Sequence, residues 1–127
     1  MIEEVLAGHK YMRLTSFRED GTGVPTPVWF AYWEGKVYFF TTHKTWKVKR
    51  IQNNPKVEFC PCTYKGKVEG DCFEAEASIL EGAEAKKAKS YLQKKYGFMY
   101  SLIRFGSWVK RNKHLFIEVV PGSGKEE

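Results

Sequence analysis

The stretch TPVWFAYWEGKVYFFTT, residues 26–42, decides the fold class. Both of its halves are rich in aromatic and β-branched residues, which is typical of strands, and the EGK tripeptide between them favours a tight turn. The preceding run YMRLTSF, residues 11–17, has the same character, and the DGTG segment after it supplies the glycines of a hairpin connection. The sequence therefore predicts an antiparallel meander of three strands.

Strand-like composition returns further along the chain. KVEFCPC, residues 56–62, predicts a fourth strand; KVEGDCFEAEASIL, residues 67–80, a long fifth; and HLFIEVVP, residues 114–121, a last one. Six short antiparallel strands favour a small closed barrel, because closure removes the exposed edges of an open sheet. The expected fold class is therefore mainly β with flanking helices (α+β).

Three segments predict helices. A short one follows residue 42, capped by Thr42 or Thr45, and ends at the NNP tripeptide of residues 53–55. EGAEAKKAKSYLQKKYG, residues 81–97, has an apolar stripe opposite its lysines and a terminal glycine. FMYSLIRFGSW, residues 98–108, predicts a second, shorter helix.

Composition limits the function classes. At 127 residues, 43% of them hydrophobic, the chain predicts a single globular domain over residues 1–127, with a frayed tail at 122–127. Its net charge of +6 admits a nucleic acid, an anionic membrane surface or a small phosphorylated ligand as partner. No apolar run approaches the roughly 20 residues of a membrane span, and the N-terminus does not resemble a secretory signal. We expect a cytoplasmic protein without a membrane partner.

The three cysteines are Cys60, Cys62 and Cys72. Their odd number in a chain without a visible signal favours reduced thiols over a disulfide framework. Only Pro61 separates the first two, which is closer than the usual spacing of a zinc pair, and no histidine lies nearby. We therefore predict no metal site and interpret the cysteines as small buried residues on a strand.

The stretch TTHKTWKVKRIQNNPKV, residues 41–57, surrounds one tryptophan with basic residues. A helix N-terminus offers unpaired N–H groups and a partial positive charge, to which Thr41 and Thr42 add hydroxyls. Lys47 and Arg50, one turn apart, can add charge-assisted hydrogen bonds. The segment predicts a phosphate-sized site; a solvated basic helix face is the alternative.

The order of T-P-V-W, K-V-K-R-I and N-N-P-K-V within VPTPVWFAYWEGKVYFFTTHKTWKVKRIQNNPKVEFCPC, followed by EAEASIL and KKYG, makes the chain similar to a known family. From Lys10 to Pro121 it resembles the pyridoxamine 5'-phosphate oxidase-like split-barrel flavoproteins, and most of all the branch of probable deazaflavin-dependent reductases. The resemblance implies a six-stranded split barrel of the FMN-binding type. It further implies a homodimer that holds FMN, or alternatively the deazaflavin coenzyme F420, between two barrels.

The resemblance also assigns binding residues. Lys47 would bind the cofactor phosphate with help from Thr41, Thr42 and Arg50. Trp46 stands where the family has a small residue, and it would either cover the cofactor or narrow the site. The residues along the ring system would be Thr26, Pro27, Val28 and Trp29, and those from the second subunit Trp108, Lys110 and Arg111.

The implied activity is hydride transfer between the cofactor and a small organic substrate. The cofactor carries that chemistry, so we predict no catalytic side chain, and the three histidines show no carboxylate or nucleophile partner. Residues 114–127 lack the Arg-x-His element of true pyridoxamine phosphate oxidases, so we expect a different substrate. Two alternatives stay open: a barrel module for single-stranded nucleic acid, which we rank lower, and a flavin carrier or sensor without turnover.

Overall fold

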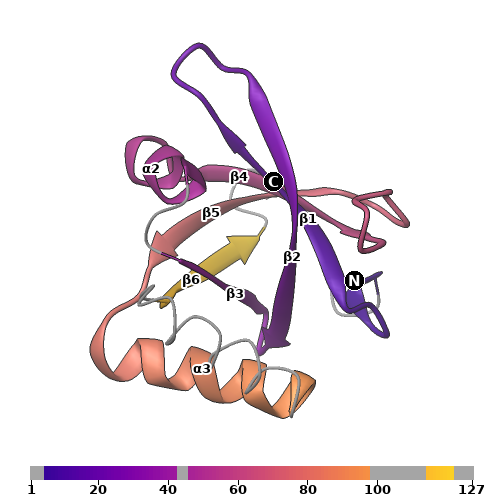
Figure 1. The fold of residues 1–127 in the computed structure, drawn as a ribbon, viewed down its shortest axis with the longest axis vertical. Coiled ribbons are helices and arrows are strands. Elements are labelled where there is room, and N and C mark those ends of the chain that lie inside the picture. The colour runs from indigo at the N-terminus through magenta and orange to yellow at the C-terminus, as the bar shows by residue number, and fades with distance from the viewer. Residues whose placement is uncertain (1–4, 43–45, 98–113, 122–127) are drawn as a thin grey trace.

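The computed structural model describes residues 5–42, 46–97 and 114–121. Its six strands are antiparallel and close into a barrel in the order β1-β2-β3-β6-β5-β4 (Figure 1). The strands are β1 (Tyr11–Phe17), β2 (Gly23–Trp33), β3 (Lys36–Thr42), β4 (Lys56–Cys62), β5 (Phe73–Ile79) and β6 (His114–Pro121); the helices are α2 (Trp46–Asn53) and α3 (Gly82–Tyr96). The predicted mainly β split barrel with flanking helices is confirmed.

The three-strand meander forms as the sequence predicts. β1 pairs with β2, and β2 with β3, through a tight turn in which Glu34 and Gly35 have φ values of 49° and 83°. Two consecutive residues with positive φ are the geometry of a type I′ turn, whose twist matches that of the strands it joins.

The prediction of a long fifth strand from Lys67 is wrong, because β5 begins only at Phe73. The residues before it fold back over β4. They are attached to β4 by a backbone hydrogen bond from Glu69 N to Pro61 O and by a single bridge between Cys62 and Val68. Gly70 permits this close approach, since a Cβ there would lie 2.8 Å from the Pro61 ring. These residues therefore form a loop that covers β4, although their composition is typical of a strand.

The barrel interior is filled by alternate residues of its strands. Phe30, Phe39 and Phe59 are fully buried there, and aliphatic residues of all six strands surround them. Because successive side chains of a strand point to opposite faces, the intervening residues lie on the outside, where helices and loops cover part of them.

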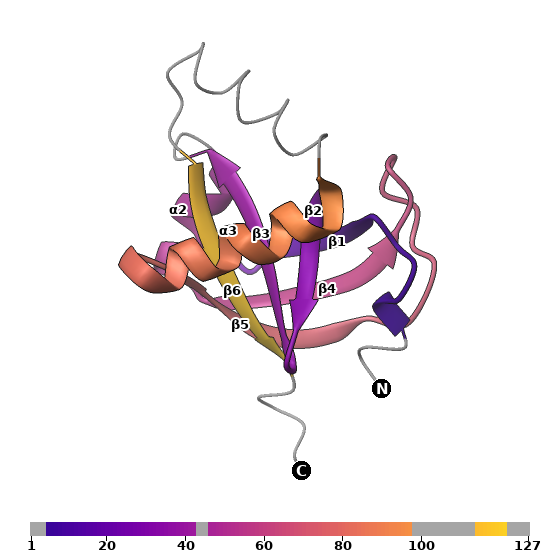
Figure 2. The ribbon, with the colours of Figure 1, turned by 90° about the horizontal axis from the view of Figure 1, so that it is seen from below.

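Helix α3 crosses the outer face of β2, β3 and β6 (Figure 2). Ala88, Leu92 and Tyr96 are its buried residues, as the predicted apolar stripe requires, and Gly97 ends it with a φ of 56°. The Tyr96 hydroxyl accepts a hydrogen bond from Phe30 N at 2.9 Å and lies 2.7 Å from the carbonyl oxygen of Lys10, to which it can donate. One buried phenol therefore fastens the end of α3 to β2 and to the residue before β1.

The expectation of three reduced thiols is also wrong for two of them. Cys60 and Cys72 form a disulfide, and Cys62 is the free, buried cysteine. β4 and β5 pair Phe59 with Phe73, so the next pair in the same register is Cys60 with Cys72. Spacing along the chain does not reveal this pairing, because it depends on which strands are neighbours.

Two predictions lie outside the described residues: the short helix over 98–108 and the frayed tail at 122–127. Within the described part of the chain, no helix has the length and apolar composition needed to cross a bilayer.

We expect Tyr96→Phe to lower the free energy of unfolding by about 1–3 kcal/mol, because the buried Phe30 N–H loses its hydrogen-bond acceptor. Urea denaturation followed by circular dichroism measures the change. Tyr64→Phe is the matched control, since Tyr64 is 65% exposed on a loop and should change the value by less than about 0.5 kcal/mol. Equal effects of the two variants would show that the Tyr96 hydroxyl does not fasten α3.

Candidate functional site

Helix α2 packs against β1 and β5 at one end of the barrel. Val48 and Ile51, three residues apart, are its buried residues and hold it there. Helical spacing then places Lys47 and Arg50 side by side at the edge of the buried face and leaves Trp46 and Lys49 more exposed. The sequence prediction that Lys47 and Arg50 share one face of a short helix is confirmed.

The Arg50 side chain is fixed by the barrel. Its Nε donates a hydrogen bond of 2.7 Å to Oγ of Ser16, which is 1% exposed near the end of β1. Within the described part of the chain only Nε has a hydrogen-bond partner, so no described residue occupies the two terminal nitrogens of the guanidinium. A guanidinium held in this way presents a rigid fork of donors of the kind that grips a phosphate through two parallel hydrogen bonds.

Three cations form a row at this end of the barrel: Lys47, Arg50 and Arg18. Burial lowers the pKa of Lys47, and the charge of Arg50 lowers it further. Burial likewise lowers the pKa of Arg50, and the charge of Arg18 adds to that effect. Both pKa shifts mark a site where positive charge is crowded and partly desolvated, which a bound anion would relieve.

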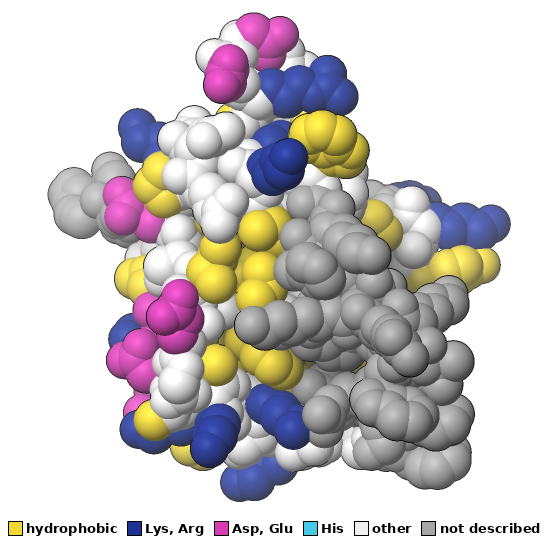
Figure 3. All heavy atoms as spheres, turned by 60° about the vertical axis from the view of Figure 1, so that its left-hand side comes forward, with side chains coloured by type: hydrophobic (Ala, Val, Ile, Leu, Met, Phe, Trp, Pro, Cys, Tyr) yellow, Lys and Arg dark blue, Asp and Glu magenta, His cyan; other side chains and the backbone are white. Residues whose placement is uncertain are grey.

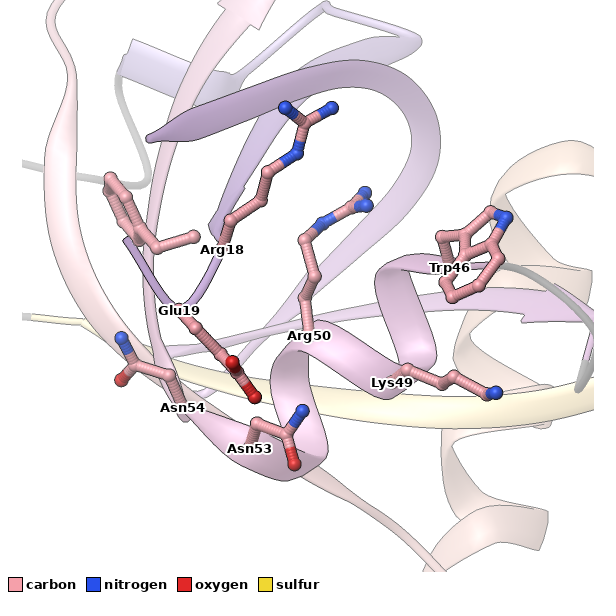
Figure 4. A pocket seen from close by; sticks show the side chains of 8 residues that line it. Arg18, Glu19, Trp46, Lys49, Arg50, Asn53 and Asn54 are labelled. Atoms are coloured by element: carbon pink, nitrogen blue, oxygen red, sulfur yellow. The ribbon is translucent and has the colours of Figure 1, made fainter. Parts of the chain in front are cut away.

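A cavity of about 730 Å³ is lined by two of these cations, Arg18 and Arg50, but not by Lys47 (Figure 4). The guanidinium groups of Arg18 and Arg50 point to the same side of it, whereas the carboxylate of Glu19 is directed toward Asn53. Its lining residues are Phe17, Arg18, Glu19, Trp46, Lys49, Arg50, Asn53 and Asn54. The cavity therefore combines cationic and amide donors with two aromatic walls.

Among the described residues, no carboxylate forms an ion pair with these cations, although Glu19 also lines the cavity. The ion pairs formed among the described residues are His9 with Glu69 and Lys36 with Glu118, and both lie away from the cavity. On the face seen in Figure 3, basic side chains lie beside an exposed hydrophobic one, below the acidic tip of the projecting hairpin. Unpaired cations around a cavity favour an anionic ligand over a merely solvated helix face.

Trp46 is the first residue of α2 and is 69% exposed. It lines the cavity, and the Lys49 ammonium lies 5.0 Å from the centre of its ring. An exposed indole held over a cation beside a cavity is a surface on which a planar ligand can stack.

The four predicted ring-contacting residues of β2 separate onto two faces. Val28 belongs to the barrel core, and Thr26 lies on the same inner face, with a buried hydroxyl that has no hydrogen-bond partner among the described residues. Pro27 is exposed on the outside. Trp29 stacks on Tyr96 with ring centres 4.2 Å apart, so its side chain is part of the α3 packing and does not line the cavity.

Of the remaining predicted residues, Thr41 is buried near the end of β3, and Thr42 is the last residue of that strand. The side chain of Thr42 and the whole of Trp108, Lys110 and Arg111 lie outside the described residues. The structure thus brings together Trp46, Lys47 and Arg50 on α2 and leaves the second-subunit residues as predictions.

Sequence reasoning missed Arg18, which it treated as part of a hairpin connection. β1 pairs with β4 so that Ser16 faces Val57, and Arg18 therefore lies near the segment that joins α2 to β4. Only the closure of the barrel shows that Arg18 lies near this segment. The signal that the sequence contained was a cation directly after the predicted first strand.

Comparison with known families gives one match over nearly the whole chain. The family model described as pyridoxamine 5'-phosphate oxidase matches residues 1–121. The chain belongs to the pyridoxamine 5'-phosphate oxidase family. Comparison with curated proteins found no match. Membership by itself establishes the fold of this chain, not its substrate.

Solved structures of this family's fold are similar to the chain across a range of functions. A pyridoxamine 5'-phosphate oxidase-related, FMN-binding protein of Nostoc punctiforme matches with a TM-score of 0.61 and 12% identity over 94% of this chain and 74% of that one. An F420 reductase matches with a TM-score of 0.58 and 20% identity over 94% and 91%. HutZ, the heme storage protein of Vibrio cholerae, matches with a TM-score of 0.69 and 15% identity over 97% and 89%. Identities this low show a shared fold alone.

We expect Arg18→Gln to separate anion binding from stability. Removing the charge relieves repulsion with Arg50, so the free energy of unfolding should stay within about 0.5 kcal/mol of the natural value or rise. Inorganic phosphate at ten times its dissociation constant should stabilise the natural protein by about 1.4 kcal/mol and the variant by less. Thermal unfolding with and without phosphate measures both quantities.

Lys67→Gln, which removes an exposed cation from a loop, is the control and should keep the full effect of phosphate. Equal stabilisation of Arg18→Gln and the natural protein by phosphate would exclude Arg18 from the anion site.

Proposed function

We propose that this protein is a flavin- or deazaflavin-dependent oxidoreductase that binds the cofactor phosphate with Lys47, Arg50 and Arg18. The observation that carries the proposal is the row of three cations, two of which line the cavity, without an ion pair to a carboxylate among the described residues. Structurally similar proteins have FMN and F420 in their names, and both of those cofactors carry a phosphate.

The donor set fits a phosphate group. Arg50 offers a fixed fork, Lys47 a compact charge one turn away, and Arg18 a second guanidinium on the same side of the cavity as that of Arg50. The first turn of α2 contains no acidic residue, so the partial positive charge of the helix N-terminus adds to theirs. Thr41 and Thr42, at the end of the preceding strand, are the proposed hydroxyl donors.

The rest of the cofactor would extend from this phosphate along the barrel. The strand segment Thr26–Trp29 is proposed to meet the ring system mainly through its backbone, because the Val28 and Trp29 side chains are used in packing and the Thr26 hydroxyl is buried on the inner face. A flavin or deazaflavin supplies hydride transfer when it is bound, so the chain needs no catalytic side chain. Its residues bind the cofactor, orient it and exclude water from one face.

The proposal includes a homodimer, in which Trp108, Lys110 and Arg111 of the second subunit close the cofactor groove. The proposed substrate is a small organic molecule. FMN is the first choice of cofactor and the deazaflavin coenzyme F420 the alternative. The exposed Trp46 lines the cavity and is the residue we propose to distinguish them.

Three other functions are outcomes of the same experiments. A flavin carrier would bind the cofactor and show no turnover with any electron donor. A haem-binding protein, like the similar storage protein, would give a Soret band with haem and no flavin binding. A module for single-stranded nucleic acid would bind oligonucleotides with an affinity that falls steeply as salt rises.

We expect Lys47→Ala to weaken FMN binding by about 1.5–3 kcal/mol, because a charge-assisted hydrogen bond to the phosphate is lost. That corresponds to roughly a ten- to 150-fold higher dissociation constant. Quenching of flavin fluorescence during titration measures it. Lys86→Ala removes an exposed cation from α3 and should leave the affinity unchanged. An unchanged affinity in Lys47→Ala would remove this residue from the site.

We expect Trp46→Gly to change the ratio of the dissociation constants for FMN and F420, because it removes the indole that either covers the cofactor or narrows the cavity. Parallel fluorescence titrations of the two cofactors give the ratio. Trp33→Gly is the control, since Trp33 is also exposed but stacks on Tyr91 at α3. The same ratio in Trp46→Gly and in the natural protein would mean that Trp46 does not select the cofactor.

A further inference from the structure

A second cluster of reactive side chains lies on the outer face of β4 and β5, separate from the cationic cavity. The register pairs Glu58 with Glu74 and, two residues further along β4, Cys60 stands opposite Cys72. Residues two apart on a strand share a face, so these four side chains occupy one patch. Nothing in the proposed cofactor chemistry uses them.

Three of these side chains can reach a common point. A carboxylate oxygen of Glu58 and the sulfurs of Cys60 and Cys72 all lie within 4.8 Å of one another. Tetrahedral zinc has bonds of about 2.3 Å to sulfur and 2.0–2.2 Å to carboxylate oxygen, which places its ligand atoms roughly 3–4 Å apart. The three groups can therefore surround one ion with small side-chain adjustments once the sulfurs are no longer bonded to each other.

The burial of the cluster suits an ion with one open position. Cys60 is fully buried, Glu58 is half-buried and Cys72 is exposed. Glu58 and Glu74 line a cavity of about 370 Å³ between the β1–β2 hairpin and the start of β4 and β5. A metal held by the two sulfurs and Glu58 would thus be reached from this cavity, with Glu74 or water next to it.

Charge supports a divalent cation at this place. Two carboxylates directly opposite each other on a sheet repel, and two thiolates would add to that repulsion. The nearby cations are Arg13, whose Nη2 lies 4.0 Å from the sulfur of Cys60, and Lys56, which lines the same cavity. Four negative groups against these two positive ones leave an excess of two negative charges.

We propose that, when the disulfide is reduced, Cys60, Cys72 and Glu58 bind a divalent metal ion that favours sulfur ligands, with Zn²⁺ as the representative. Thiolates are the ligands that select such metals. The disulfide and the metal exclude each other, because sulfurs joined to one another are not thiolates. The sequence did not suggest this site, since its ligands come from two strands whose pairing must be known.

The test uses the full chain in both redox states. A water-soluble phosphine reduces the S–S bond to two thiols and is itself oxidised, with oxygen from water, to the phosphine oxide. After anaerobic removal of the phosphine, Co²⁺ is titrated as a spectroscopic substitute for Zn²⁺. We expect one Co²⁺ per reduced chain, with thiolate-to-cobalt charge-transfer absorption that Zn²⁺ abolishes, and no such absorption with the disulfide intact.

Variants identify the ligands. Cys72→Ser and Glu58→Gln should each raise the Co²⁺ dissociation constant at least about tenfold, since even residues that only support metal ligands have effects of this size. Cys62→Ser is the control and should bind like the natural protein, because Cys62 lies on the same strand but outside the cluster. Circular dichroism establishes that each variant is folded. The Glu58→Gln variant retains all three cysteines, so it tests the carboxylate ligand alone.

Three results would overturn the proposal. One is a reduced natural protein that shows no charge-transfer absorption with Co²⁺. The second is a Glu58→Gln variant that binds Co²⁺ as tightly as the natural protein, and the third is a Cys62→Ser variant that loses binding as Cys72→Ser does. None of these results bears on FMN binding, so this inference and the proposed function fail separately.

Discussion

The hydrogen bond from Arg50 to the buried hydroxyl of Ser16 connects the two parts on which function depends: the helix after the meander and the barrel itself. Val48 and Ile51 hold α2 on the barrel by apolar contact, which by itself leaves the rotation of long side chains free. A charged hydrogen bond to a fixed partner removes that freedom for the guanidinium. The same arrangement leaves a partly desolvated cation beside Arg18 and Lys47, which favours the binding of an anion.

Barrel closure determines which residues meet. Because β1 pairs with β4 as well as with β2, the end of β1 brings Arg18 next to the chain that leaves α2. The neighbouring pair, β4 and β5, aligns Cys60 with Cys72 and Glu58 with Glu74 on the outside. The cationic cavity and the thiol–carboxylate cluster therefore arise from one topology, and the cavity next to the cluster shares Phe17 and Asn54 with the cationic one.

Local patterns in the sequence predict the strands well, because the alternation of apolar and polar residues and the positions of turn residues depend only on residues that are close together along the chain. The boundaries of β1, β3, β4 and β6 agree with the runs that suggested them, and Lys47 and Arg50 share a helix face because their spacing requires it. The loop before β5 was mistaken for strand since its composition suits either, and only Gly70 against Pro61 shows why it folds back. Arg18 and the Cys60–Cys72 pair depend on strand register, which no local pattern contains.

The central claim is that the cations of α2 and the hairpin bind the phosphate of a flavin-type cofactor. The most direct measurement compares the dissociation constants of FMN and riboflavin, which share the ring system and differ in the phosphate. If the cations bind the phosphate, FMN should bind at least about tenfold more tightly, since one charged hydrogen bond contributes about 1.5–3 kcal/mol. Equal affinity for the two flavins would contradict the account.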